Sequence, residues 1–109
     1  MDVTGKNKKT NKLYSSFESL RAKYGPVDAK NIMKKLKRLR TFHDLYEAWR
    51  NGLKCHPLSA DYHGVVSIPI TPNYRLLIQP CLPEWVKVSG IESWKYVTKA
   101  HILKYEDYH

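Results

Sequence analysis

The sequence predicts an α+β domain, in which an N-terminal antiparallel helical hairpin packs on a small antiparallel sheet. Two patterns indicate this class. Apolar residues recur at helical spacing in the first half of the chain, and short apolar segments bounded by turn residues, as is typical of strands, follow in the second half. The chain has 109 residues, 42% of them apolar, which is enough for one domain with its own core.

Residues 1–12 are rich in Lys, Asn and Thr and contain almost no apolar side chains. Such a segment buries too little apolar surface to offset the entropy that is lost when it becomes ordered. We therefore expect a flexible basic arm at residues 1–12, followed by a single folded domain at residues 13–109.

Two helices are expected next. The first runs from Leu13 to Tyr24, where apolar residues follow helical spacing, and it stops at Gly25-Pro26. Asp28 is the expected N-cap of the second helix, whose apolar stripe consists of Ile32, Met33, Leu36 and Leu39. Because the break between the two helices is short, they should form an antiparallel hairpin.

The pattern changes to that of strands after a short helical segment at residues 44–49. Residues 65–70 and 74–79 are expected to form a β-hairpin, because a Thr-Pro-Asn turn separates them. Pro69 lacks a backbone donor, so it should lie at an edge, at a bulge or near a strand end. A short strand at residues 85–88 and a long one at residues 96–105 should follow, the latter being the best candidate for a central strand.

The net charge of +9 is confined to the first half of the chain. Residues 1–54 contain 14 of the 19 Lys and Arg residues but only five of the 10 Asp and Glu residues, so they carry the whole excess. This asymmetry favours a polyanion or an acidic protein as a partner. The residues expected to make that contact belong to the second helix: Lys34, Lys35, Lys37 and Arg38.

Several classes are disfavoured by composition. No apolar run approaches the roughly 20 residues of a membrane span, and the polar N-terminus does not resemble a secretory signal. A cytoplasmic location, with no membrane contact, is therefore expected. Cys55 and Cys81 should be reduced there, and they lack the spacing of a zinc site, so we expect no metal and no cofactor.

Residues that can transfer protons gather in two stretches. The apolar run near the C-terminus is followed by Glu106-Asp107-Tyr108-His109, and a second stretch contains His56 and, a few residues later, His63. Imidazole has an unperturbed pKa near 6.5, which makes both of its protonation states available at neutral pH. The two stretches are therefore candidates for the two halves of an active site.

The same stretches resemble HigB-type toxins of the RelE/ParE superfamily of toxin–antitoxin modules. The central signature is His56-Pro57-Leu58, Asp61, Gly64, Ser67-Ile68 and Tyr74-Arg75-Leu76. The ending is similar too: Trp94-Lys95-Tyr96-Val97-Thr98, Ile102-Leu103 and Glu106-Asp107-Tyr108-His109. Together with the helical hairpin, the resemblance covers residues 13–109.

The resemblance implies a compact fold like that of microbial ribonucleases, and metal-independent cleavage of messenger RNA on the ribosome, which arrests translation. It also implies a HigA-like helix-turn-helix antitoxin as partner, through which operator DNA would be contacted. The residues that match the catalytic positions of the family are His56, Asp107, Tyr108 and His109, and Arg75 matches its strand arginine.

We assign hypothetical roles to these residues. His56 and His109 would be the general base and general acid, in either order. Asp107 would orient an imidazole or act as the base itself, and Tyr108 would bind the phosphate or stack on a nucleobase. Arg75 would hold the phosphate, unless it only pairs with Asp107 or Glu106 across the strands. His63 would supply an additional positive charge when protonated.

Some positions depart from the family pattern. Ser59-Ala60 and Tyr62-His63 stand where the family often has lysine-glycine and a basic pair, and Pro69 lies near the position of a missing arginine. Two alternatives therefore stay open. One is a non-enzymatic ParE-like inhibitor that binds a protein target, and the other is a catalytically weakened module kept for antitoxin binding and operator control. The basic helices would likewise contact either ribosomal RNA or an acidic antitoxin surface.

Overall fold

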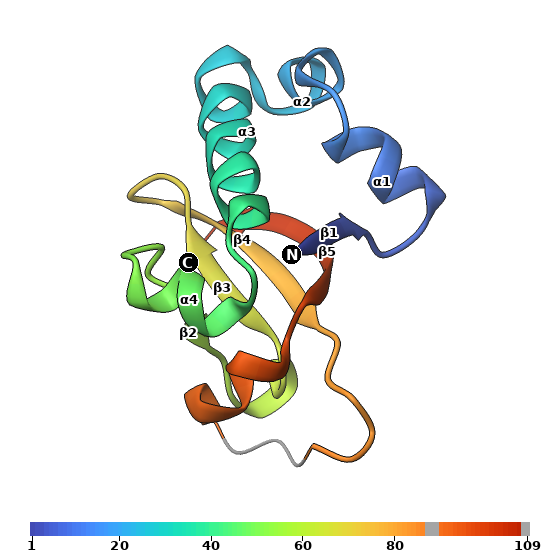
Figure 1. Cartoon of the computed structure of the whole chain (residues 1–109). Coiled ribbons are helices and arrows are strands. Elements are labelled where there is room, and N and C mark those ends of the chain that lie inside the picture. The colour runs from blue at the N-terminus through green and yellow to red at the C-terminus, as the bar shows by residue number, and fades with distance from the viewer. Residues whose placement is uncertain (87–89, 108–109) are drawn as a thin grey trace.

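The structure of the protein, a computed structural model, describes residues 1–86 and 90–107. It confirms the α+β class (Figure 1). The helices are α1 (Lys8–Tyr14), α2 (Phe17–Tyr24), α3 (Pro26–Thr41) and α4 (Leu45–Arg50), with short 3₁₀ helices η1 (Ala60–Tyr62) and η2 (Gly90–Tyr96). The strands are β1 (Asp2–Gly5), β2 (His56–Pro57), β3 (Val66–Pro69), β4 (Tyr74–Pro80) and β5 (Lys99–Asp107).

Within the described residues, the strands form one sheet in the order β1-β5-β4-β3-β2. Strands β2 to β5 pair antiparallel with their neighbours, and β3 and β4 form the expected hairpin. Strand β1 pairs parallel with β5, so the prediction of a wholly antiparallel sheet is wrong at this edge. The expected long strand begins later than predicted, because residues 90–96 form η2, and β4 rather than β5 lies at the centre of the sheet.

The N-terminal segment differs most from the structure that its composition predicts. Residues 1–12 are not a flexible arm in this structure, because they contribute β1 and the first part of α1. The buried Val3 joins the main core, while the side chain of Arg40 donates a 2.8 Å hydrogen bond to the Val3 carbonyl. Asn7 caps α1 by accepting a hydrogen bond from the Thr10 amide. A few specific contacts therefore order a segment of low hydrophobicity.

The expected first helix is divided into α1 and α2. The division occurs because the Ser16 hydroxyl accepts a hydrogen bond from the Ser19 amide and so caps a new helix. The start of α3 also differs from the prediction. Gly25 is the N-cap residue and Pro26 is the first helical residue, so Asp28 lies inside the first turn of the helix instead of capping it.

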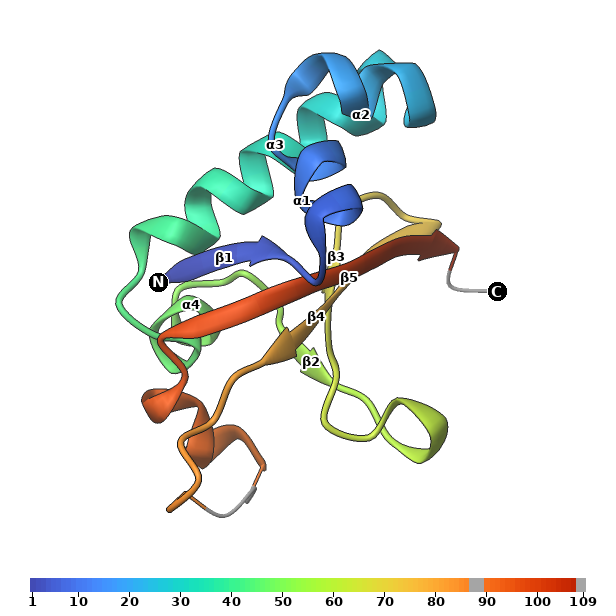
Figure 2. The same ribbon diagram turned by 90° about the vertical axis from the view of Figure 1, so that its right-hand side faces the viewer.

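Helices cover one face of the sheet, and the main core lies between these helices and the sheet (Figure 2). Helix α3 contributes a buried stripe of Ala29, Ile32, Leu36 and Leu39. Strands β3 to β5 contribute alternate residues, including Val66, Ile68, Leu76, Ile78 and Ile102. The side chains between these residues belong to the opposite face of the sheet, which α3 does not cover.

The predicted strand at residues 85–88 lies partly outside the described residues. Residues 85 and 86 belong to a turn and a bend, so no strand is present in the described part of this segment. Trp85 is 74% exposed and its ring lies edge-on to that of Tyr96, with a centroid separation of 5.3 Å.

Candidate active site

The candidate site lies on the sheet face opposite α3. Because successive side chains of a strand point to opposite faces, the core residues Leu76 and Ile78 place Arg75 and Leu77 on the other face. Residues that pair across neighbouring strands share a face. On β5, Glu106 pairs with Arg75 and Lys104 pairs with Leu77. On the other side, Ser67 of β3 pairs with Leu77, and His56 of β2 pairs with Ser67. Four neighbouring strands therefore contribute to one surface.

Two cations and one carboxylate form the centre of this surface. Arg75 Nη2 lies 3.6 Å from Glu106 Oε1, and Lys104 Nζ lies 4.0 Å from Glu106 Oε2. The side chains of Arg75 and Glu106 are 18% and 22% exposed, whereas that of Lys104 is 50% exposed. This geometry agrees with the hypothesis that Arg75 pairs with Glu106 across the strands, and it leaves Lys104 the most accessible charge.

Tyr62 of η1 joins this cluster from the loop between β2 and β3. Lys104 Nζ lies 5.4 Å from the centroid of the Tyr62 ring. The Tyr62 side chain, followed by the charge of Glu106, raises the pKa of Lys104. Lys104 therefore keeps its positive charge throughout the neutral range, so the surface offers a constant cation to an anionic ligand.

His56 and His63 lie beside the cluster. His56 is an exposed residue of β2, and its ring belongs to the same face of the sheet as Arg75. His56 lies two strands away from β4, opposite Leu77, and Arg75 is two residues before Leu77 along β4. These spacings place the Cα atoms of His56 and Arg75 about 12 Å apart. His63 is also exposed, and it lines a hollow of about 330 Å³ with Gln79 and Trp94.

Strand register assigns Asp107 to the other face of the sheet. Asp107 pairs with Tyr74 and follows Glu106, so alternation places its side chain on the helical face of the sheet, with Tyr74 and Tyr105. The register also places the Cα atoms of Asp107 and His56 about 17 Å apart. Tyr108 and His109, the other two residues of the predicted C-terminal half, lie outside the described residues.

The four cations predicted on the second helix do not form one surface. Lys34 and Lys37 are exposed and line a groove along α3. Lys35 is half-buried, and its burial, together with the charges of Arg38 and Lys54, lowers its pKa. Arg38 donates a hydrogen bond to the carbonyl of Asn51. Lys34 and Lys37 therefore face solvent along the groove, whereas Lys35 and Arg38 face the region around Asn51 and Lys54.

Lys104 and Tyr62 were not among the site residues predicted from the sequence, and Glu106 was named only within the C-terminal stretch and as a possible partner of Arg75. The alternation of Lys104 and Glu106 in β5 was a usable signal, because residues two apart on a strand share a face. The position of Tyr62 was not predictable, since it depends on how the loop after β2 folds. In the part of the chain that the structure describes, no group of three or more His, Cys, Asp and Glu side chains is arranged to hold a metal ion.

The sequence matches no model of a known protein family and no curated protein. Among the described residues, no helix is both long and apolar enough to cross a membrane. The class that fold and site define is thus an α+β domain with a cluster of two cations and a carboxylate on the sheet face opposite α3.

Proposed function

We propose that this protein is a HigB-type toxin that cleaves ribosome-bound messenger RNA without a metal ion. The observation that supports the proposal best is the shared sheet face of His56, Arg75, Lys104 and Glu106. A face with two cations suits a phosphodiester, and an imidazole, which that face also carries, can transfer protons at neutral pH. The proposal also rests on the resemblance of the sequence to this family.

In this mechanism the ribose 2′-oxygen attacks the adjacent phosphorus while a general base removes its proton. The bond between phosphorus and the 5′-oxygen breaks, and a general acid protonates the leaving oxygen, which leaves a 2′,3′-cyclic phosphate and a 5′-hydroxyl. Arg75 and Lys104 would stabilise the additional negative charge of the transition state. His56 would serve as one of the two proton-transfer groups, and His109 remains the candidate for the other.

The geometry adds a second candidate for the carboxylate role. The resemblance assigns this role to Asp107, but Glu106 is the carboxylate that lies between Arg75 and Lys104. A carboxylate held in place by two cations would accept a hydrogen bond from an imidazole and so orient it. That imidazole would not be His56, because the register places the Cα atoms of His56 and Glu106 about 16 Å apart. We therefore propose that Glu106 performs the task that the resemblance assigns to Asp107, with His63 as an additional cation at the edge of the site.

Primer extension on messenger RNA after induction of the protein tests this proposal. New 5′ ends within translated codons are expected for the original sequence, and they should disappear in His56→Gln and in His109→Gln. His43→Gln is the matched control, because the His43 side chain is 79% exposed and lies in the segment between α3 and α4. Cleavage that persists in both His56→Gln and His109→Gln would overturn the assignment.

The separation of His56 from both Glu106 and Asp107 favours one other candidate function. A non-enzymatic ParE-like inhibitor needs no converging proton-transfer groups, and its basic surface would bind a protein target. This alternative predicts growth arrest without new messenger RNA ends, and no effect of His56→Gln on that arrest. The catalytically weakened module predicts no toxicity at all, so the same induction experiment separates the three functions.

The remaining parts of the proposal concern partners and location. A toxin of this class would act in the cytoplasm, and a HigA-like helix-turn-helix antitoxin would neutralise it. Operator DNA would be contacted only through that antitoxin. Co-expression of the adjacent open reading frame tests this arrangement, because a cognate antitoxin should restore growth and co-purify with the protein.

A further inference from the structure

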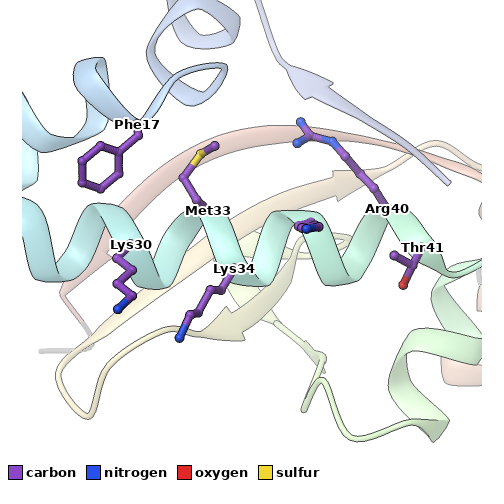
Figure 3. A pocket seen from close by; sticks show the side chains of 7 residues that line it. Phe17, Lys30, Met33, Lys34, Arg40 and Thr41 are labelled. Carbon is purple, nitrogen blue, oxygen red and sulfur yellow. The ribbon is translucent and has the colours of Figure 1, made fainter.

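The exposed side of α3 carries a groove that the proposed RNA chemistry does not use. The groove has a volume of about 640 Å³, and its lining comes from α2 and from one side of α3 (Figure 3). The lining residues are Phe17, Lys30, Met33, Lys34, Lys37, Arg40 and Thr41. From the apolar and charged character of this lining, we propose that the groove docks an acidic amphipathic helix of a protein partner.

The apolar part of the groove consists of Phe17 and Met33, which lie on the same side of α3 in Figure 3. Phe17 is 41% exposed, and Met33 packs only partly against the core. Methionine and aromatic side chains are enriched at surfaces that bind partner proteins, because a flexible thioether and a flat ring adapt to apolar side chains. A partner helix would cover this strip with its own apolar stripe.

The charged part of the groove consists of Lys30, Lys34 and Lys37, which follow one another at helical spacing. All three are exposed, and none forms an ion pair with a described residue. They would face the acidic flank of a partner helix. Residues 30 to 41 of a helix span about 16 Å, which is three turns of such a partner.

Arg40 lies at one end of the groove, and its guanidinium is already engaged by the backbone of β1. Its guanidinium donates hydrogen bonds to the Val3 carbonyl, from Nη2 at 2.8 Å and from Nε at 3.3 Å. The groove therefore has a fixed end at β1 and, along its length, a row of lysines that form no ion pair with any described residue. A nucleic acid would use the lysines but not the Met33 surface, since phosphate contacts need no apolar strip. The combination of an apolar strip with a row of lysines favours an acidic protein segment over RNA as the ligand of the groove.

Methyl NMR on the full chain tests the proposal directly. The sequence contains two methionines, Met1 and Met33, so labelling the methionine methyl groups with ¹³C gives one signal in the groove and one outside its lining. The probe is a synthetic helical peptide of about 14 residues, with leucine at helical i, i+3, i+4 and i+7 spacing and glutamate on both flanks. Saturable movement of the Met33 signal is the expected result.

Two triple variants separate the groove from general charge attraction. Lys30, Lys34 and Lys37 are replaced with Gln in one variant, and Lys6, Lys9 and Lys23 in the matched control. The first variant should weaken peptide binding about tenfold, as expected for three exposed ion pairs, and the control should change it less than about twofold. Equal losses in both variants would overturn the proposal, because they would indicate attraction to net charge alone.

Two further outcomes also overturn it. One is an unchanged Met33 signal at saturating peptide. The other is a Met33 signal that responds to a single-stranded oligouridylate but not to the peptide, which would make the groove a nucleic-acid site. Met33→Leu should retain binding and Met33→Ser should weaken it, with the far-ultraviolet circular dichroism of both variants reporting the fold. The proposal stands without the RNA chemistry, because none of these readouts depends on cleavage.

Discussion

The hydroxyl group of Tyr105 donates a hydrogen bond to the carboxylate of Asp28 across 2.9 Å. This contact joins the last strand, β5, to the first turn of α3. The ring of Tyr105 also lies edge-on to Tyr24 at 4.9 Å and stacks on Tyr74 at 5.2 Å. Because Lys104 and Glu106 flank Tyr105, these contacts fix the strand that presents both charges on the opposite face of the sheet.

Replacing Tyr105 with Phe should therefore destabilise the fold. The aromatic contacts would remain, but the partly buried Asp28 carboxylate would lose its donor, at a cost of about 1–3 kcal/mol. Urea denaturation of Tyr105→Phe, Asp28→Asn and the double variant measures the coupling between the two side chains. If the two single losses simply add, the hydrogen bond contributes nothing to stability.

The N-terminal strand yields a second prediction. A Cβ atom on Gly5 would lie 2.2 Å from the backbone nitrogen of Asn11, so Gly5→Val should displace α1 from β1. The expected loss is about 1–3 kcal/mol in the free energy of unfolding, as for other overpacked sites. Thr4→Val is the matched control, because Thr4 is an exposed neighbour on the same strand. Equal stability of Gly5→Val and Thr4→Val would mean that residues 1–12 form the flexible arm that their composition predicts.

Cys55 makes stability depend on alkaline pH. Burial raises the pKa of the Cys55 thiol from 9.0 to about 11. The unfolded chain therefore ionises first, and the contribution of the neutral thiol is fully present below pH 9 and lost as pH rises toward 11. A shift of this size corresponds to about 2–3 kcal/mol.

Urea denaturation between pH 8 and pH 11 measures this effect. The stability of the original protein should fall more steeply over this range than that of Cys55→Ala, while the other alkaline titrations stay common to both. Alkylation offers an independent readout, because the half-buried Cys81 should react with iodoacetamide well before the buried Cys55. Identical pH dependence in the two proteins would contradict the assigned environment of Cys55.

Lys104 gives a prediction for RNA binding. If its ammonium group contacts one phosphate, Lys104→Gln should reduce the slope of log K against log salt by about 0.7 for single-stranded RNA. Lys95→Gln removes the same charge from an exposed position in η2 and should leave the slope unchanged. Fluorescence anisotropy over a salt series supplies the measurement, and equal slopes for the original protein and Lys104→Gln would remove Lys104 from the site.

The elements with strong periodic patterns were predictable from the sequence. Ile32, Leu36 and Leu39 show the helical spacing of α3, and the turn at residues 71–73 marks the β3–β4 hairpin. The order of residues 1–12 was not predictable, because Val3 is buried by a parallel pairing with residues about 97 positions away. Composition alone does not indicate so distant a contact.

The candidate site was predictable only in part. Arg75 and His56 could be named from the sequence, but the face on which each lies follows from strand register. Asp107 and Glu106 are adjacent in the sequence, and alternation sends their side chains to opposite faces of the sheet. A shift of one residue in the register would exchange them, so the choice between these carboxylates requires the structure.

We propose that the sheet face of His56, Arg75, Lys104 and Glu106 performs RNA cleavage. The most direct test of this claim is the single-turnover rate of messenger RNA cleavage on purified ribosomes by Glu106→Gln and by Asp107→Asn. We predict a loss of about 10²–10⁴-fold for Glu106→Gln and a much smaller loss for Asp107→Asn. Full activity of Glu106→Gln, with activity abolished in Asp107→Asn, would contradict the claim.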